Sequence, residues 1–514
     1  MSGKKTVAGL LVVTLVFLGL QPAFAHGFGE RYDLPVPLNL FIAGAAATVA
    51  LSFVVISLFV RGRPGMLRYP RYDLLRVPAA GAVLQSGYLL LPLRLASVGL
   101  FALVVISGLF GTNKPVENLI PTFVWVIWWV GMGYWSALIG NLWMLINPWA
   151  VVFDWVEKLA GGGSGRPGAA MFRYPERWDV WPAFAMFFAF AWVENVYFGA
   201  ARPFNLGMLV LLYSVVTWAG MIAFGKHTWL AHGEVFSVLF GFFARFSPTE
   251  VRVTDRRLCA ACELECAPDE DCVDCYSCFE RAAGPAREFN VRPYAVGLTL
   301  PKRVSTATVA FVVLALATVT FDGLSETSIW LSFQNATYSA ATVFGRNAVA
   351  AIDTMGLVLA PLAFLIVYLG FSWGVSRLSG QQTLVTDVAK TFVFSLVPIA
   401  LAYNMAHFIS LLAIQGQYII PLASDPLGLD WDILGTSDYR VNIAIVNAKF
   451  VWYTAVTAIV VGHIVSVFVA HVIALAEIPD RARALRSQYP MLLLMITYTA
   501  TSLWIIAQPV LSGD

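Results

Sequence analysis

Four ionisable side chains lie inside or at the ends of long apolar stretches of this sequence. They are Glu194, Asp322, Asp353 and His407. An ionisable group within a membrane is costly, so it generally marks a functional site or a buried pair. Counted inward from the expected outer ends of their helices, all four lie in the outer third of the membrane. The sequence therefore predicts one outward-facing polar pocket.

Carboxylates and imidazoles in such a pocket can bind a divalent metal, and a metal with an open position activates bound water. We expect Glu194, Asp353 and His407 to be ligands of a divalent metal ion whose identity the sequence does not give. His26 is a further candidate ligand, because a terminal amine and an imidazole on one residue can chelate together. Asp322 would orient or deprotonate the attacking water, with His407 and Glu194 as the other catalytic residues.

Simpler interpretations of these residues stay open. Each acid could be a helix-end residue or a buried hydrogen-bond partner, and His26 could be solvated. Asp322 precedes a glycine and could be a turn residue at a helix exit. His463 and His471, in a later apolar stretch, are expected to be packing side chains, with proton transfer as the alternative.

A second cluster contains all the cysteines of the chain, with the spacing C-x2-C-x3-C-x5-C-x2-C-x2-C. In a reducing cytoplasm, such a cluster is typical of metal ligation. We expect a structural zinc ion, because the spacing matches neither common ferredoxin pattern; an iron–sulfur cluster and disulfides remain the alternatives. The cysteines are Cys259, Cys262, Cys266, Cys272, Cys275 and Cys278.

The elements that must position these residues are membrane-spanning helices. With 59% hydrophobic residues, 12% charged residues and a mean hydropathy of +0.72, the chain is too apolar for a soluble protein of 514 residues. Backbone amides in lipid need partners within their own segment, so the spans must be helical and the fold all-α. About ten segments have the required length of roughly 20 residues: 38–60, 95–111, 119–139, 180–198, 205–224, 304–321, 348–375, 391–413, 448–475 and 490–510.

Residues 1–25 are typical of a secretory signal peptide. Lys4 and Lys5 precede an apolar run, and Ala23-Phe24-Ala25 has the small residues of a cleavage site. Cleavage would leave His26 as the amino terminus outside the cytoplasm. An uncleaved first helix is the alternative.

The distribution of basic residues predicts the orientation of the chain. The loops 61–94, 147–179, 225–303, 376–390 and 477–488 together hold 25 Lys and Arg, whereas the opposite loops and tails hold 5. Cytoplasmic loops carry the excess of Lys and Arg. We therefore expect a multi-pass protein of a bacterial inner membrane, with both mature termini in the periplasm.

This topology divides the chain into four parts: the signal peptide 1–25, a five-helix membrane half 26–225, a cytoplasmic loop 226–303 and a second five-helix half 304–514. The loop is expected to hold an interfacial helix from Trp229 to Phe246 as well as the cysteines. The formal net charge is only +2, which gives no case for a nucleic-acid partner. The expected partners are the lipid bilayer and a small-molecule substrate, and a second membrane subunit could complete the site.

Short motifs are spread across most of the chain. They are His26-Gly27, Asp33-Leu34-Pro35-Val36-Pro37, Asn147-Pro148-Trp149, Trp192-Val193-Glu194, Thr320-Phe321-Asp322-Gly323, the run from Pro398 to His407, Gln415-Gly416-Gln417, Ser424-Asp425-Pro426-Leu427-Gly428, Trp452-Tyr453, Gly462-His463 and Ser487-Gln488-Tyr489. With these motifs the chain resembles a family of bacterial multi-span proteins named fenitrothion hydrolase. The resemblance covers about 26–250 and 290–510 and leaves the cysteine cluster out.

Two functional hypotheses follow. The resemblance implies a membrane-bound hydrolase of organophosphorus triesters, which fits a metal-assisted site on the periplasmic side. No G-x-S-x-G or H-E-x-x-H motif is present, so a serine nucleophile or a zinc-protease site is disfavoured. The alternative is a transporter or metal-handling membrane protein, in which Asn404 and His463 extend the polar pocket toward the cytoplasm.

Overall fold

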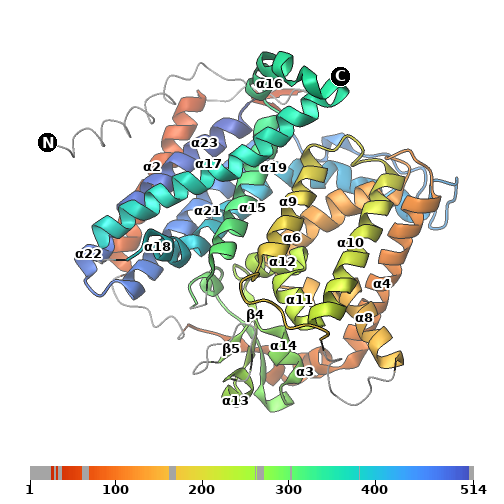
Figure 1. Ribbon diagram of the computed structural model, residues 1–514, viewed down its shortest axis with the longest axis horizontal. Coiled ribbons are helices and arrows are strands. Elements are labelled where there is room, and N and C mark those ends of the chain that lie inside the picture. Colours follow the sequence, from red (N-terminus) through yellow and green to blue (C-terminus); the bar gives the residue numbers. More distant parts are fainter. Residues whose placement is uncertain are drawn as a thin grey trace.

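The computed structural model describes residues 25–27, 30–32, 37–60, 69–160, 170–260, 262, 271–300, 304–380 and 383–508. Most of these residues are helical, which confirms an all-α membrane bundle (Figure 1). The expected signal peptide lies outside the described residues apart from Ala25. The side chain of His26 also lies outside them.

The helices of the first part of the chain are α2 (Leu38–Phe59), α3 (Pro78–Gln85), α4 (Gly87–Phe110), α5 (Leu119–Pro121), the π-helix η2 (Thr122–Val130), α6 (Gly131–Leu138), α7 (Trp143–Ile146), α8 (Pro148–Leu159), α9 (Trp181–Asn195), α10 (Pro203–Phe224), α11 (Lys226–His232) and α12 (Val235–Ala244). Those of the last part are α15 (Thr306–Ser325), α16 (Ser328–Ala341), α17 (Ala348–Ser379), α18 (Val385–Phe392), α19 (Val397–Ile414), α20 (Ile419–Ser424), α21 (Ala448–Glu477), α22 (Arg481–Ser487) and α23 (Tyr489–Ile506). Short 3-10 helices are η1 (Leu74–Arg76), η3 (Gly284–Ala286), η4 (Val296–Leu298), η5 (Thr342–Asn347), η6 (Val393–Leu396), η7 (Gln415–Tyr418) and η8 (Ile443–Ile445).

Eight helical segments of the described chain are long and apolar enough to cross a membrane. The other two expected spans are helical but shorter or interrupted. The segment 119–139 is divided by the nine-residue π-helix η2, and 180–198 contains the 15-residue helix α9. Periodicity in a uniformly apolar stretch does not distinguish a π-helix from an α-helix, so the sequence did not show this interruption.

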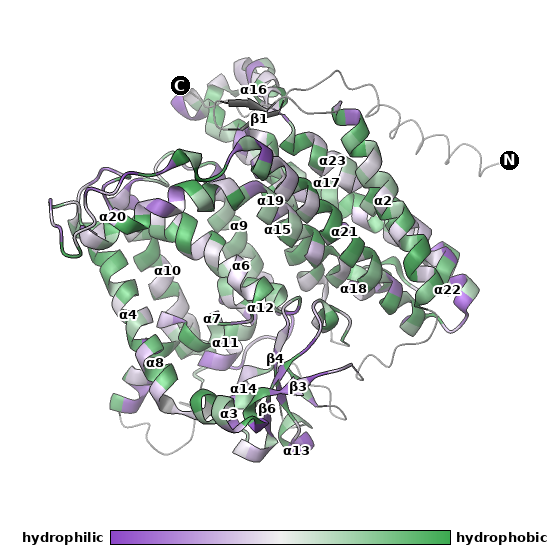
Figure 2. Cartoon of the chain, turned by 180° about the vertical axis from the view of Figure 1, so that it is seen from behind, coloured by the Kyte–Doolittle hydropathy of each residue, from purple (hydrophilic) through white to green (hydrophobic). Residues whose placement is uncertain are grey.

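The helices form two groups that lie beside each other (Figure 1). One contains α4 to α12 and also the short helix α20 (Figure 2), which contacts α5 and η2. The other contains α15 to α19 and α21 to α23. Helix α2 belongs to the second group, because it packs against α21 and α23. The expected half 26–225 is therefore not one spatial unit. Sequence order alone does not determine which of several apolar faces a helix will bury.

The segment from Trp229 to Phe246 is not the interfacial helix that we expected. It forms α11 and α12, which are separated at Gly233 and Glu234. Nearly every residue of α12 is buried, and the helix packs against α6, α9 and α19. A helix that is apolar on all sides belongs inside a bundle rather than along a surface.

A small domain with a four-stranded antiparallel sheet lies at one end of the bundle (Figure 1). Its order is β3-β6-β4-β5, and β4 pairs with β6 from Thr249 opposite Val291 to Val253 opposite Arg287. Because β3 comes from the loop 61–94 and the other strands come from 225–303, the sheet joins two loops that were predicted to share one side of the membrane. The strands and helices are β3 (Tyr72–Asp73), β4 (Thr249–Val253), α13 (Arg256–Ala260), β5 (Cys272–Val273), α14 (Tyr276–Arg281) and β6 (Arg287–Val291); the hairpin β1 (Ala25–Gly27) and β2 (Glu30–Tyr32) is separate.

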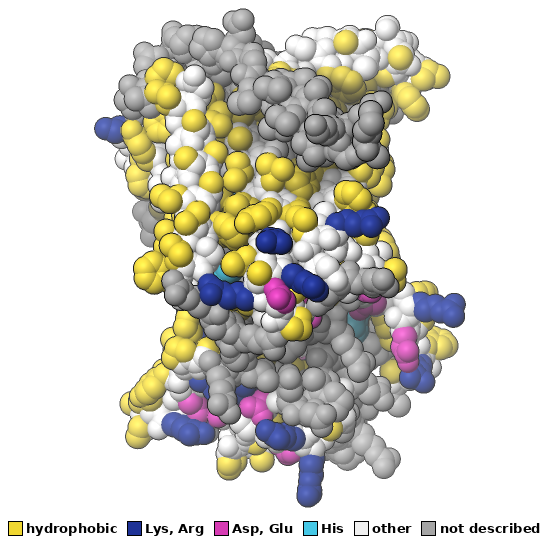
Figure 3. Space-filling model, turned by 90° about the vertical axis from the view of Figure 1, so that its left-hand side faces the viewer, with side chains coloured by type: hydrophobic (Ala, Val, Ile, Leu, Met, Phe, Trp, Pro, Cys, Tyr) yellow, Lys and Arg dark blue, Asp and Glu magenta, His cyan; other side chains and the backbone are white. Residues whose placement is uncertain are grey.

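The surface of the bundle is predominantly apolar. Hydrophobic residues colour the long helices, while hydrophilic residues gather in the sheet domain and in the loops at the two ends (Figure 2). One face of the molecule shows a broad hydrophobic region, with Lys and Arg side chains below it (Figure 3). This arrangement is that of a multi-pass membrane protein.

Candidate functional site

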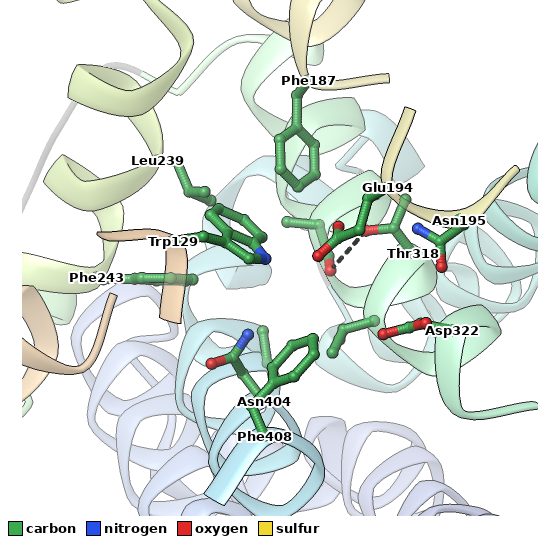
Figure 4. Close-up of a pocket in the computed structure, with 13 residues that line it drawn as sticks. Trp129, Phe187, Glu194, Asn195, Leu239, Phe243, Thr318, Asp322, Asn404 and Phe408 are labelled. Atoms are coloured by element: carbon green, nitrogen blue, oxygen red, sulfur yellow. Dashed lines mark hydrogen bonds between the residues drawn. The ribbon is translucent and has the colours of Figure 1, made fainter. Parts of the chain in front are cut away.

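Two acids from different helices meet at a small cavity inside the bundle. Glu194 comes from the end of α9 and Asp322 from the last turns of α15, and both line the cavity with Asn195 and Asn404. The space accessible to the centre of a water molecule is about 20 Å³, which is room for one or two waters. Figure 4 shows the carboxyl groups of Glu194 and Asp322 on the same side of this cavity.

His407 lies beside these two acids and contacts Asp322 directly. Its Nε2 lies 2.9 Å from Oδ2 of Asp322, and it is close enough to Glu194 and Glu326 for their charges to interact. Asp322 and Glu326 are four residues apart at the end of α15, so they share a helical face. Glu326 was missed in the sequence because it follows the apolar stretch and resembles an ordinary loop residue.

Asp322 is not a turn residue, because it and Gly323 both lie within α15. The absence of a side chain at Gly323 has a packing reason. A Cβ there would lie 2.6 Å from Oη of Tyr403 and 3.6 Å from Nδ1 of His407. The glycine thus permits the close approach of α15 and α19 that joins Asp322 to His407.

Asp353 does not join this group. Its Oδ1 accepts hydrogen bonds from Nε1 of Trp330 at 2.8 Å and from Nε2 of Gln334 at 2.6 Å, both on α16. The structure therefore does not assemble the expected metal site of Glu194, Asp353 and His407. Among the described residues, no group that includes these side chains brings three donor atoms within 4.8 Å of one another. The position of a residue along its helix does not show the direction in which the side chain points.

The tryptophan Trp129 forms the opposite wall of the cavity. It lies in the π-helix η2, and its buried indole nitrogen interacts with the carboxyl group of Glu194. Figure 4 shows this nitrogen directed toward the space between Glu194 and Asn404. π-helical segments are rare and often occur at functional sites. No sequence signal distinguished Trp129 from its apolar neighbours.

A row of aromatic and imidazole rings leads inward from the acidic group. The ring centroids of His407 and Tyr403 are 6.4 Å apart, those of Tyr403 and Tyr498 6.5 Å, and those of Tyr498 and His463 5.8 Å. Tyr498 also shares a hydrogen bond with the hydroxyl of Thr320. The row crosses from α19 to α23 and ends at His463, in the middle of α21.

Two polar atoms of this row are buried and lack partners among the described residues: Oη of Tyr403 and Nε2 of His463. Nδ1 of His463 is bonded to the carbonyl of Ile459 at 2.7 Å. By contrast, both ring nitrogens of His471 lie within hydrogen-bond distance of oxygen atoms, Oε1 of Gln488 at 2.8 Å and the carbonyl oxygen of Val60 at 3.0 Å. His471 is thus held by side-chain and backbone contacts at both nitrogens, whereas His463 retains a nitrogen that can exchange a proton.

A buried acid at the opposite end of the first helix group was also missed. Glu234 caps α12 by accepting from the backbone nitrogens of Phe236 and Ser237, and it bonds to Tyr213 and Asn147. Asn147 in turn caps α8. The polar atoms of these groups are hydrogen-bonded to one another, so Glu234 has a structural role. The same hydrogen bonds give Asn147 of the Asn147-Pro148-Trp149 motif a structural role.

The cysteines form a second candidate site, in the sheet domain. The sulfurs of Cys262, Cys275 and Cys278 lie within 4.8 Å of one another, and this group could hold a metal ion. Sγ of Cys259 instead lies 3.3 Å from the backbone nitrogen of Cys272 and 3.6 Å from the carbonyl oxygen of Val253. Cys272 is disulfide-bonded, and Cys266 lies outside the described residues. The expected metal site is thus present in part, with three of the six cysteines, and the alternative of a disulfide holds for Cys272.

A buried network of charges fixes the loop that carries these cysteines. Arg292 bonds to Glu250 at 2.8 Å and to Asp274 at 3.1 Å, and Arg252 bonds to Glu250 at 3.1 Å. Asp274 has a positive φ of 56°, which turns the chain between Cys272 and Cys275. The ion pair of Asp274 with Arg292 holds that turn against the sheet.

The pKa values of two thiols and of Glu250 in this domain shift in opposite directions. Hydrogen bonding to Cys262 and burial raise the pKa of Cys275, and burial raises the pKa of Cys278 to about 11. Burial would also raise the pKa of Glu250, but Arg292 and Arg252 outweigh it, so the pKa of Glu250 is lowered. The thiols therefore hold their protons at neutral pH until a cation displaces them, whereas Glu250 is ionised.

No protein-family model matches this chain, and neither a curated protein nor a solved structure matches it. The geometry of the two sites is therefore the basis for any functional assignment.

Proposed function

We propose that this protein is a proton transporter of a bacterial inner membrane, with its proton-binding site at the pocket of Glu194, Asp322 and His407. One observation carries the proposal: the row of rings that leads from this acidic pocket to His463 in the middle of α21. Ionisable residues inside a membrane bundle are typical of proton relays and ion pathways.

The size and polarity of the pocket support this function. A cavity with room for one or two waters suits protons and water, whereas small-molecule sites commonly have volumes on the order of 300 Å³ or more. The partnerless atoms of Tyr403 and His463 can each donate or accept a proton. A proton leaving His407 would therefore meet Tyr403, Tyr498 and His463 in turn.

Proton flux into proteoliposomes tests the proposal. Vesicles with a trapped pH-sensitive dye would be given a membrane potential by a potassium gradient and valinomycin. We expect flux through the wild type, at least tenfold less through Asp322→Asn or His463→Phe, and no loss for Asp353→Asn. Flux equal to that of protein-free vesicles, or equal in all these variants, would overturn the proposal.

A second candidate is the hydrolase of organophosphorus triesters that the sequence resemblance implies. The hydrogen bond between Asp322 and His407 favours it, because a carboxylate beside an imidazole at a water-sized cavity can activate water as a general base. Triester substrates would require the cavity to open. Release of nitrophenol from an aryl phosphotriester, lost in His407→Gln, would support this candidate, and turnover unchanged in that variant would exclude this site.

For the cysteine group we propose a bound zinc ion, with the sheet domain in the cytoplasm. The support is the three-thiol group itself, since Zn²⁺ is commonly bound by thiolates at protein sites. Metal analysis of the purified protein beside Cys275→Ser tests this: about one zinc per chain in the wild type and much less in the variant are expected.

A further inference from the structure

A large cavity separates the sheet domain from the membrane bundle. The space accessible to the centre of a water molecule is about 1020 Å³, compared with about 20 Å³ for the cavity lined by Glu194 and Asp322. Its walls come from α11, α12, α14 and α15, so it lies between the cysteine domain and the helices. Two of the three grouped cysteines, Cys262 and Cys275, belong to its lining.

The charged part of this lining is mixed in sign. Arg173 and Arg245 line it together with Asp179 and Asp274, and two imidazoles, His227 and His232, add to them. Nδ1 of His232 lies 3.3 Å from Asp179. A cavity with both signs of charge and imidazole donors can accept a polar molecule that itself carries both signs.

We propose that a thiophilic divalent cation held by Cys262, Cys275 and Cys278 lies in the wall of this cavity and binds a small thiol from it. The proposal rests on the metal-binding part of the proposed function and extends it, because a closed structural site would not meet a cavity. Zinc sites that exchange ligands combine three protein donors with one external ligand.

A small thiol is the expected ligand because soft thiolate donors select the same metals as the cysteines do. In the binding step, the sulfur of the thiol forms a bond to the metal and its proton passes to solvent. A water molecule or another weak ligand leaves the metal. No oxidant or reductant is needed.

The spectrum of Co²⁺ bound in place of zinc gives a direct test on the purified full chain. We expect one Co²⁺ per chain with thiolate charge-transfer bands, and a shift of the visible bands when 2-mercaptoethanol is added. A phosphine reductant, which also reduces the disulfide of Cys272 but carries no thiol, should not cause this shift. A thiol attached to a large dextran should cause no shift, because the polymer cannot enter the cavity.

Two matched variants distinguish failure of metal binding from failure of ligand access. Cys275→Ser should lose the cobalt bands, whereas Cys259→Ser should keep them, because the contacts of Cys259 are with backbone groups. Bound cobalt with bands that 2-mercaptoethanol leaves unchanged would overturn the proposal while preserving the metal site. Equal loss of cobalt in both variants would also overturn it, since Cys259 would then be a fourth thiolate ligand.

Discussion

Asp322 and Asp353 show how the same residue type at a similar depth can have different roles. Asp322 pairs with an ionisable partner, His407, whereas Asp353 receives two neutral donors from α16. The positions of both residues within apolar stretches predict a similar depth. They do not predict the partners, because the depth of a residue in its span does not show which helix lies beside it, and Trp330 and Gln334 belong to the separate helix α16.

This difference predicts opposite consequences for the same substitution. Asp322→Asn removes the carboxyl group whose Oδ2 lies 2.9 Å from Nε2 of His407, so we expect proton flux to fall at least tenfold. Asp353→Asn keeps a group of the same size that can still accept from Trp330, so flux should stay within about a factor of two while stability falls by about 1 kcal/mol. The dye assay in proteoliposomes measures the first effect and thermal unfolding in detergent the second. A larger loss of flux in Asp353→Asn would mean that α16 and Asp353 take part in the pathway.

Glu250 is the residue on which the sheet domain depends most strongly. Its side chain and that of Arg292 are both 0% exposed. Removing one partner of a buried pair leaves an uncompensated charge, at a cost of about 3–5 kcal/mol. Glu250→Gln should therefore lower the unfolding temperature clearly, while Glu176→Gln, whose pair with Arg173 is solvent-exposed, should change stability by less than about 1 kcal/mol.

The lowered pKa of Glu250 also predicts that the stability of the protein depends on pH. Because the pKa of Glu250 is lowered in the fold, its stabilising contribution is present above its unfolded pKa of about 4.3 and is lost as pH falls through the folded value. The difference in unfolding temperature between wild type and Glu250→Gln should therefore be constant from pH 7 to about pH 5 and shrink below about pH 4. A difference that stays constant into acid would show that Glu250 is not the group responsible.

At the scale of elements, the close contact of α19 with α21 positions both ends of the ring row. Gly462 allows this contact, because a Cβ there would lie 2.3 Å from Cβ of Ala402 and 2.7 Å from the carbonyl oxygen of Pro398. Gly462 precedes His463 directly. The spans themselves could be predicted from hydropathy, but the pairs of helices that touch could not, since nearly every face of each span is apolar.

Substitutions of two glycines test this packing. Gly462→Ala should destabilise the protein by about 1–3 kcal/mol, the cost of overpacking, because one of the two clashes is with backbone. Gly370→Ala on α17 adds a methyl group with nothing within 4 Å and should be neutral or slightly stabilising. Thermal unfolding of both variants in one detergent compares them. Equal stability would mean that α19 and α21 are farther apart than described.

At the scale of the whole molecule, the chain is not two consecutive halves. Helix α2 packs against α21 and α23 in the bundle, and β3 pairs with β6 in the sheet domain. Two elements from the start of the chain therefore contact elements from much later in the sequence. Hydropathy and basic residues predicted the spans and the loops that share a side, and the sheet is consistent with that sharing. Neither hydropathy nor the distribution of basic residues shows which helices lie next to one another in the membrane.

The orientation of the molecule is the remaining prediction, and it decides which compartment each site faces. The excess of basic residues, 25 against 5, predicts that the sheet domain is cytoplasmic. Ser339 in α16 and Thr383 before α18 are both exposed and lie at opposite ends of α17. In right-side-out membrane vesicles, a membrane-impermeant maleimide should label Ser339→Cys but leave Thr383→Cys and the native cysteines unlabelled until detergent and a chelator are added. The reverse pattern would place the cysteine cavity outside and the acidic pocket at the cytoplasmic face, and the direction of proton entry would then be inverted.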